Sequence, residues 1–146
     1  MNTKAGIMIN DLHSYDDFGL YIADRNVSPP ERVTNFVSLP YMNGYYDFGA
    51  IIKPYYSSRT LTYTFDIMED DEVTVEALKN EIISWAQTAV ESKIYDDEDP
   101  DYYFIGSYTS AQFTSDDNLP EYGGKMTLTF TAQPYRYNRE TDEGVI

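Results

Sequence analysis

An aspartate, a histidine and a serine fall within four residues near the amino terminus, and these are the residue types of a hydrolase triad. Asp11, His13 and Ser14 would supply a carboxylate, a base and a nucleophile. Triad members come together from separate segments and need an orienting shell, which adjacency in the sequence does not provide. We therefore predict that His13 is a surface residue of a loop and that no residue is catalytic.

Two runs of carboxylates are the second candidate for chemistry, at residues 69–72 and 96–101. Carboxylate oxygens bind calcium, but a loop starting at Asp97 has Tyr102 where an EF-hand needs glycine and Tyr108 where it needs glutamate. Runs of like charge usually repel and stay hydrated, so solvated turns are favoured over an irregular calcium site. A hydrolase with paired carboxylates would need one acid in an apolar setting, and neither run provides it. We predict no metal and no cofactor.

Composition narrows the function classes further. The 146-residue chain has 25 Asp and Glu against 10 Lys and Arg, a formal net charge of −15. Affinity for nucleic acids and for anionic membranes depends on Lys and Arg, so direct binding of either is disfavoured. The chain has no cysteine, which excludes disulfides and thiolate chemistry. Phosphate-binding, dinucleotide-binding and nucleophile-elbow motifs are also absent from the sequence, which therefore predicts a protein that is not an enzyme.

Period-two alternation dominates the pattern and predicts half-buried antiparallel strands. It is clearest over residues 60–67 and 125–132, where we predict one inward face: Leu61, Tyr63, Phe65, Ile67, Met126, Leu128, Phe130 and Ala132. Weaker strand patterns cover residues 5–9, 18–23, 32–38, 50–56, 102–109 and 110–114. The chain is therefore predicted to be mainly β (α+β), of antiparallel sandwich or barrel type.

One helix is predicted over about residues 74–89. Thr74 is its expected cap, and Val75, Leu78, Ile82, Trp85 and Ala89 recur at helical spacing, which makes Trp85 a core residue. Asn43-Gly44 predicts a tight hairpin turn. Residues 116–124 read as a polar loop and residues 138–146 as a tail or truncated linker, which leaves a single domain over residues 1–137.

The 15 tyrosines allow two interpretations. Tyrosine is favoured at protein–protein interfaces because it combines a large apolar ring with a polar tip. Aromatic side chains are also common in β-strands for packing alone.

Several motifs occur in a characteristic order. They are Ser14-Tyr15-Asp16-Asp17-Phe18-Gly19-Leu20, Val37-Ser38-Leu39-Pro40 followed by Asn43-Gly44-Tyr45-Tyr46-Asp47, the strand with Phe65, Ile83-Ser84-Trp85 at the helix end, the acidic turn over residues 97–103, and Leu128-Thr129-Phe130-Thr131-Ala132-Gln133-Pro134-Tyr135-Arg136. Over residues 11–137 the chain resembles the amino-terminal ring domain of siphophage distal tail proteins (Dit).

The resemblance implies a structural virion component. It implies a sandwich like that of phage tail-tube proteins, with one flanking helix and an extended hairpin arm that reaches a neighbour. Members form a hexameric ring at the tail tip that joins the tail tube to the baseplate hub, with a channel through which DNA passes without specific binding. The implied partners are therefore sister copies, the tail tube protein and the tail-tip hub protein, with no membrane. The protein would be made in the bacterial cytoplasm and reside in the virion. The candidate subunit-interface residues lie in the arm over residues 39–48: Pro40, Tyr41, Asn43, Gly44, Tyr45, Tyr46 and Phe48.

Charge and length lead to further expectations within this resemblance. Six copies would carry roughly −90 formal charges, so buried contacts or a basic partner must oppose self-repulsion. We expect part of this charge to face the channel and keep DNA from sticking, with a purely outer, solubilising location as the alternative. Many members carry a second, carboxy-terminal domain, so we expect a minimal member or an isolated ring domain. The alternative functions are a tail-tube subunit and a carbohydrate-binding β-sandwich module, with a glycosidase behind both.

Overall fold

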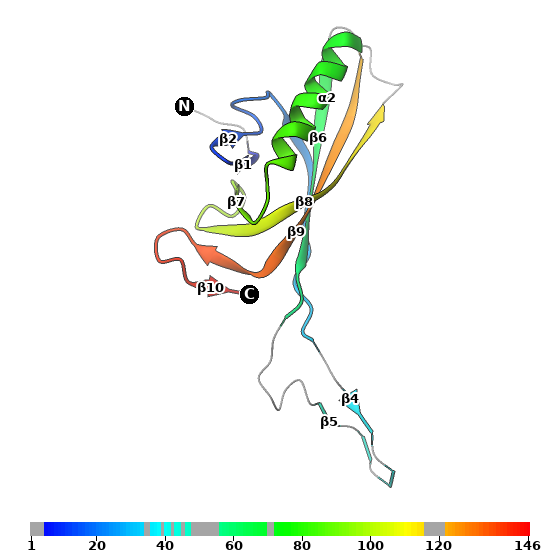
Figure 1. Ribbon diagram of the computed structural model, residues 1–146, viewed down its shortest axis with the longest axis vertical. Helices are drawn as coiled ribbons and strands as arrows, with labels where there is room; N and C mark the ends of the chain where they lie inside the picture. Colours follow the sequence, from blue (N-terminus) through cyan, green and yellow to red (C-terminus); the bar gives the residue numbers. More distant parts are fainter. Residues whose placement is uncertain are drawn as a thin grey trace.

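The structure is a computed structural model in which the chain folds into strands and a helix. It describes residues 5–33, 36–38, 40–41, 43–44, 46–47, 56–69, 72–115 and 122–146. The elements are β1 (Ile7–Ile9), β2 (Leu12–His13), β3 (Tyr21–Val27), β4 (Phe36–Val37), β5 (Tyr46–Asp47), β6 (Arg59–Glu69), α2 (Glu72–Gln87), β7 (Ser92–Asp96), β8 (Tyr102–Ser115), β9 (Tyr122–Asn138) and β10 (Gly144–Val145). The predicted mainly β fold with a flanking helix is confirmed (Figure 1).

Eight strands form one antiparallel sheet in the order β2-β1-β7-β8-β9-β6-β3, with β10 added beside β9. Register shifts in β8, between Phe104 and Gly106 and between Tyr108 and Ser110, mark where this long strand bends. Arg25 on β3 and Tyr63 on β6 both bond to Asp96 on β7, near the other end of the strand order. The sheet therefore folds over itself into two layers, as a sandwich does.

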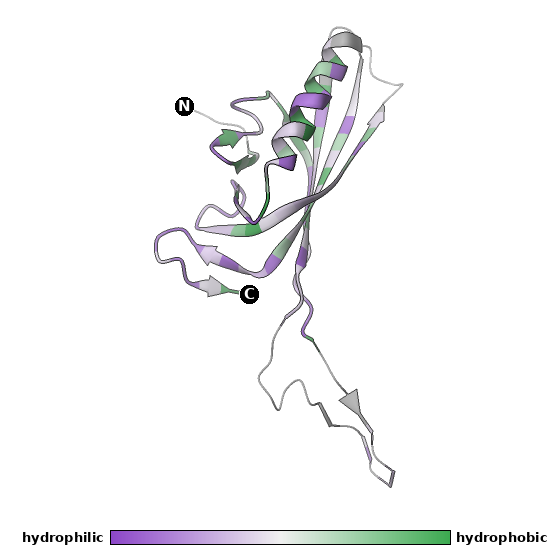
Figure 2. Ribbon diagram, viewed as in Figure 1, coloured by the Kyte–Doolittle hydropathy of each residue, from purple (hydrophilic) through white to green (hydrophobic). Residues whose placement is uncertain are grey.

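The core lies between these layers and beneath α2. All eight side chains predicted to face inward from residues 60–67 and 125–132 are buried. Each large apolar side chain removed from water contributes roughly 1.5–3 kcal/mol. Trp85 is buried as predicted, and α2 packs along β6, β8 and β9. Figure 2 shows hydrophobic and hydrophilic residues alternating along the strands and the helix. This alternation is expected where a strand or a helix buries one side and exposes the other.

Several boundaries differ from the predictions. The helix begins at Glu72, so Thr74 lies inside its first turn and the predicted cap is wrong. Residues 102–109 and 110–114 form the single strand β8, because a bulge there interrupts the side-chain alternation without ending the strand. The strand predicted over residues 18–23 is β3, displaced toward Val27, since a turn ends at Gly19 with φ of 68°.

Other predictions fall wholly or partly outside the described residues. Residues 48–55, which hold most of the strand predicted over 50–56, are among them, and so are residues 116–121 of the predicted loop. Tyr56 is described and forms an isolated bridge with Arg32. In the first acidic run, Asp70 and Asp71 also lie outside the described part of the chain.

The carboxy-terminal residues turn back onto the sheet. Gly144–Val145 pairs with Arg136 and Tyr137 of β9, and the Asn138 amide donates to the Glu143 carbonyl at 2.9 Å. The segment over residues 138–146 thus packs against the domain, while the domain boundary at residue 137 stays a prediction. Within the described residues, the helical segments are too short or too polar to cross a membrane.

Candidate functional site

The predicted hairpin arm is present as a separate two-stranded sheet. β4 pairs antiparallel with β5, and Figure 1 shows both strands apart from the eight-stranded sheet. Val37 pairs with Tyr46, a register that centres the connection between residues 41 and 42. The tight turn predicted at Asn43-Gly44 is therefore wrong in position, because turn position follows strand register. Gly44 does adopt a positive φ of 92°, consistent with the freedom that glycine brings to a turn.

The predicted interface residues fall into three groups. Pro40, Tyr41, Asn43 and Gly44 are exposed, Tyr46 belongs to β5, and Tyr45 and Phe48 lie outside the described residues. Tyr41 has a relative exposure of 108%, so its ring packs against nothing in its own subunit. Whether these residues meet another subunit stays a prediction.

His13 is buried in β2, so its predicted place on the surface of a loop is wrong. Its Nδ1 accepts hydrogen bonds from the amides of Tyr15 at 3.0 Å and Asp16 at 3.2 Å. Its Nε2 lies 2.7 Å from Asp97 Oδ2, and because Nδ1 accepts, Nε2 is the donor. Ser14 Oγ accepts from the Ile7 amide at 3.0 Å. Both side chains are engaged in holding the amino-terminal strands, which leaves no nucleophile and base in contact.

Asp96 departs from the prediction of a solvated acidic turn. Its side chain is buried, and Oδ2 accepts from Arg25 Nε and, at 3.3 Å, from the Tyr63 hydroxyl. Oδ1 accepts from the Glu98 amide at 3.0 Å. A buried carboxylate needs such partners because desolvation opposes its charge. Burial, reinforced by the nearby Asp96 charge, raises the pKa of Tyr63 well above its usual value.

The rest of the second acidic run forms a turn in which two carboxylates, those of Asp97 and Asp99, have protein partners, whereas Glu98 and Asp101 are exposed. Asp97 accepts from the Gly6 amide at 3.1 Å as well as from His13, and Asp99 pairs with Arg136 at 2.9 Å. Across the described part of the chain, no group of three or more acidic or histidine side chains is gathered to hold a metal ion.

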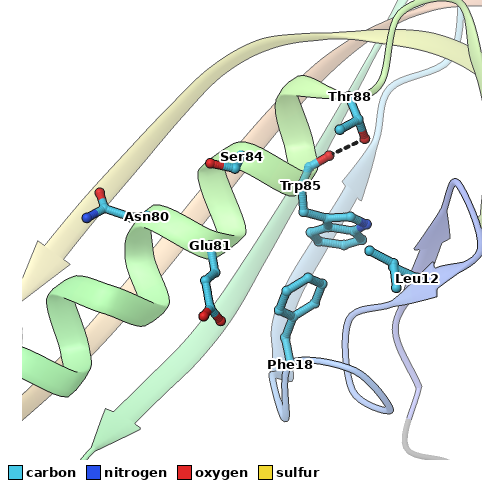
Figure 3. Close-up of a pocket in the computed structure, with 7 residues that line it drawn as sticks. All are labelled: Leu12, Phe18, Asn80, Glu81, Ser84, Trp85 and Thr88. Atoms are coloured by element: carbon cyan, nitrogen blue, oxygen red, sulfur yellow. Dashed lines mark hydrogen bonds between the residues drawn. The ribbon is translucent and has the colours of Figure 1, made fainter.

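A surface pocket of about 440 Å³ lies beside α2 (Figure 3). Leu12, Phe18 and Trp85 form its apolar floor, and the Phe18 and Trp85 rings are 5.1 Å apart. Glu81 is the one carboxylate among the lining residues, whereas hydrolysis of a glycoside by the usual route needs two facing acids. The Trp85 indole is also occupied, donating to the Ile9 carbonyl at 3.1 Å. The pocket thus provides apolar surface without a catalytic pair.

Tyrosines and cations cluster over β7, β8 and β9. Lys93 lies 4.9 Å over the Tyr103 ring, Arg139 lies 4.6 Å over Tyr95, and Arg136 lies 4.6 Å over Tyr102. Cations on aromatic faces are attracted by the ring quadrupole, and they occupy the faces on which a sugar would stack.

The Tyr103 hydroxyl of this cluster donates to Asp142 at 2.6 Å. This hydrogen bond to a carboxylate, assisted by burial, raises the pKa of Tyr103 to about 12. The bond also joins β8 to the turn that precedes β10.

The outer side of β3, β6, β8 and β9 is a polar surface, which we call the hydroxyl face. Cross-strand register aligns it in rows, such as Ser110, Thr129, Thr62 and Asn26. Its members are Tyr21, Asp24, Asn26, Thr60, Thr62, Thr64, Asp66, Ser110, Gln112, Thr114, Lys125, Thr127, Thr129 and Thr131, all exposed or half-buried. The alternate threonines of β6 and β9 are visible in the sequence, but their alignment across four strands depends on register.

The same part of the sheet has two open edges within the described residues. β7 pairs with residues 103–106 of β8, the Tyr108 amide donates to the Ala89 carbonyl, and residues 109–115 have β9 on one side alone. At the opposite edge, β3 pairs with β6 and with no further strand. Open edges present unpaired amides and carbonyls that another chain can bind. Periodicity in the sequence gives no signal for them.

Comparison with known proteins agrees with this architecture. Residues 10–132 match the family model described as phage tail protein RIFT-related domain (Sipho_tail). Among solved structures, the chain resembles Dit (gp 19.1) of the phage SPP1, with a TM-score of 0.75 and 16% identity over 93% of this chain and 53% of that chain. The chain thus spans about half the length of that protein, whose structure is described as a paradigm of the hub adsorption apparatus in phages that infect Gram-positive bacteria. No curated protein matches the chain.

The likeness to SPP1 Dit concerns the fold, and the resemblance to distal tail proteins is confirmed at that level. The family match covers most of the chain. This protein therefore belongs to the phage tail protein RIFT-related domain family and is a structural phage tail protein with a Dit-like fold.

Proposed function

We propose that this protein forms a hexameric ring at the tip of a phage tail, where it joins the tail tube to the tail-tip hub of the baseplate. Family membership and the likeness to SPP1 Dit, a hub adsorption protein, support this role. The partners are sister copies, the tail tube protein and the hub protein. DNA passes through the central channel without specific binding, no membrane is contacted, and the virion tail is the site of action.

The observation that carries the ring is the pair of open edges. β8, β9, β6 and β3 alternate in direction, so the two edge strands run opposite ways. A rotation about an axis roughly parallel to the strands leaves the direction of each strand unchanged. It therefore places β3 of one copy beside residues 109–115 of β8 in the next copy, with the two strands antiparallel. Such a head-to-tail contact closes into a ring when the rotation divides a full turn.

The β3 edge also has features that limit uncontrolled pairing. Its register shifts between Ile22 and Asp24, and Arg25 points inward to Asp96. Bulges and inward charges are devices by which natural sheets protect their edges. Only residues 24–27 of β3 have the regular geometry that pairing with a further strand requires. An edge this short favours one defined neighbouring strand over the continued addition of strands.

The arm supplies a second contact in this proposal. Pro40, Tyr41, Asn43, Gly44, Tyr45, Tyr46 and Phe48 are its proposed contact residues. Tyr41 is exposed on a hairpin that stands apart from its own sheet (Figure 1). Exposed tyrosines are efficient interface anchors because they bury a large area while losing little conformational entropy.

Cysteine cross-linking tests the ring, since the natural chain has no cysteine. The double variant Asn26→Cys/Ser110→Cys places one thiol at each open edge, in the same cross-strand row. With a short bismaleimide we expect a ladder of covalent products that ends at the hexamer, because each copy links to two neighbours. Each single variant is the matched control and should give no ladder.

Three other results would contradict the proposal. If the protein remains monomeric at every concentration tested, including in the presence of purified tail tube and hub proteins, the ring is excluded. A hexamer without edge cross-links would exclude edge pairing. Long tubes of stacked rings would identify a tail-tube subunit instead.

A further inference from the structure

We infer that the pocket beside α2 is a docking site for a segment of another protein that presents an aromatic or leucine-like side chain next to lysine or arginine. The pocket of about 440 Å³ lies between the helix and the segment that carries Leu12 and Phe18 (Figure 3). Its lining includes none of the residues proposed above as contacts between copies, which lie in the arm and along β3 and β8. The pocket is therefore open to a different partner, and this inference does not depend on the ring.

The floor of the pocket is apolar surface that the fold leaves uncovered. Leu12 has a relative exposure of 40%, and Phe18 is half-buried with its ring 5.1 Å from that of Trp85. Figure 3 shows these three side chains gathered at one end of the pocket. Pockets that hold ligands span roughly 300–1,000 Å³ and combine apolar and aromatic walls with a few placed polar groups. This pocket has that size and character, so it accommodates an apolar side chain of a partner.

Hydrogen bonds fix the walls of the pocket in the free protein. The Trp85 indole donates to the Ile9 carbonyl at 3.1 Å. The Asn10 side-chain amide donates to the Thr88 carbonyl at 3.1 Å and to the Thr88 hydroxyl at 2.9 Å, which joins the turn after β1 to the end of α2. A site that is already ordered loses less conformational entropy when a partner binds. The apolar floor is thus presented in a form ready for a partner.

The charges beside the pocket are acidic. Glu81 lines the pocket, is exposed, and makes no ion pair with any residue that the structure describes. Asp11 and Asp17 are exposed next to Leu12 and Phe18 in the sequence. Complementary potentials steer partners together and select among them. A segment with cations beside its apolar side chain therefore fits this site, whereas an acidic segment is repelled.

The single lysine of α2 does not balance Glu81. Lys79 Nζ bonds to Glu76 at 3.0 Å and lies 4.3 Å over the Phe113 ring of β8. Its charge is thus used on the helix surface that meets β8. The carboxylate in the pocket is left to a cation from a partner.

A second copy of this chain fits the pocket less well. Tyr41 is its most exposed large apolar side chain, but no lysine or arginine lies within two residues of it in the sequence. Tyr135 is followed by Arg136, whose guanidinium is engaged by Asp99 at 2.9 Å. The combination of an apolar anchor and an available cation therefore points to a different protein.

Fluorescence tests the inference, because Trp85 is the one tryptophan of the chain and forms part of the pocket floor. The probe is the peptide acetyl-Lys-Leu-Phe-Lys-amide, which contains neither tryptophan nor tyrosine. One control peptide has glutamate in place of both lysines, and the other has Gly-Ser in place of Leu-Phe. We expect the lysine peptide to change the Trp85 emission in a saturable way, with an affinity at least about tenfold above that of either control. This affinity should fall as salt rises. Equal affinity for the three peptides, or no saturable response to any of them, would overturn the inference.

Two variants locate the binding in the pocket. Glu81→Lys should weaken binding of the lysine peptide at least about tenfold and strengthen binding of the glutamate peptide. Leu12→Ser should weaken binding of the lysine peptide to a similar extent, through loss of apolar contact. Glu140→Lys makes the same change of charge in the turn before β10, outside the pocket, and as the matched control should alter the affinity by less than about twofold.

All three substituted side chains are exposed, so the unfolding midpoint of each variant should match that of the natural protein. Unchanged binding by Glu81→Lys or Leu12→Ser would overturn the inference. A response that is present in the monomer and absent from an assembled hexamer would show that a sister copy occupies the pocket, which would overturn the choice of partner. Failure of the ring would leave all the peptide measurements unaffected, since none of them requires assembly.

Discussion

Asp96 and His13 show how single polar residues act inside an acidic chain. Both side chains are buried and hydrogen-bonded. Asp96 bonds to Arg25 and Tyr63. His13 bonds to Asp97 through Nε2 and to backbone amides through Nδ1. An unpaired buried charge costs several kcal/mol, so polar residues in such places are retained with their partners. Their chemistry is therefore used to join strands, and neither is left free to act on a substrate.

Tyr103 provides a pH-dependent test at the same scale. Its hydrogen bond to Asp142 raises its pKa to about 12 from 10.0, which stabilises the neutral phenol in the folded state. The contribution is complete below pH 10 and disappears as the pH rises through 12. We expect Tyr103→Phe to lower the free energy of unfolding by about 1–2 kcal/mol at neutral pH, and the difference from the natural protein to shrink between pH 10 and 12.

Urea unfolding followed by circular dichroism over this pH range makes the measurement. Tyr135→Phe, at an exposed position of β9, is the control and should differ little from the natural protein. A difference between Tyr103→Phe and the natural protein that stays constant up to pH 12 would contradict the assignment.

At the scale of elements, the two layers of the sheet are joined where Asp96 on β7 meets β3 and β6. Asp96→Ala would remove the carboxylate and leave Arg25 without its buried partner. We expect the free energy of unfolding to fall by about 2–4 kcal/mol, because breaking a buried pair leaves one charge uncompensated. Asp101→Ala, exposed in the following turn, should change it by less than about 0.5 kcal/mol. Equal losses for the two variants would show that the interlayer bond contributes little.

The arm makes a different prediction, because Tyr41 contributes to assembly and not to the fold of one copy. Its ring is fully exposed, so Tyr41→Ser should leave the unfolding midpoint of the monomer unchanged. We expect the concentration needed for half-assembly to rise at least about tenfold, as for an aromatic anchor at an interface. Sedimentation over a range of protein concentrations measures this. Unchanged assembly would exclude Tyr41 as a contact.

At the scale of the whole molecule, net charge opposes the proposed ring. Every copy carries −15, and the hydroxyl face accounts for one unit of it. Salt shortens the range of repulsion, from about 30 Å at 0.01 M to about 10 Å at 0.1 M. We therefore expect the hexamer fraction to increase with salt over this range, measured by light scattering at fixed protein concentration. A hexamer that dissociates as salt rises would show that attractive ion pairs hold the ring instead.

The sequence by itself determined the alternating and helical segments of this protein. Leu61 to Ile67 and Met126 to Ala132 alternate so regularly that their inward faces follow from the period of a strand, and Trp85 lies on the apolar stripe of α2 for the corresponding helical reason. Ordered motifs also led to the family. Local periodicity predicts these buried faces because the side chains of one segment alone determine which of its sides is apolar.

The tertiary structure decided where the polar residues and the edges lie. Arg25 and Asp96 are 71 residues apart, and His13 and Asp97 are 84 apart, so no local pattern records that they meet. The sequence pattern does not predict β7, because Asp96 interrupts its apolar alternation and the Asp96 carboxylate is bonded by residues from distant strands. Strand order alone leaves β3 and the end of β8 open, and register alone aligns the threonines into a face. Such features arise from pairing between distant segments, which the sequence encodes only through the energy of the complete fold.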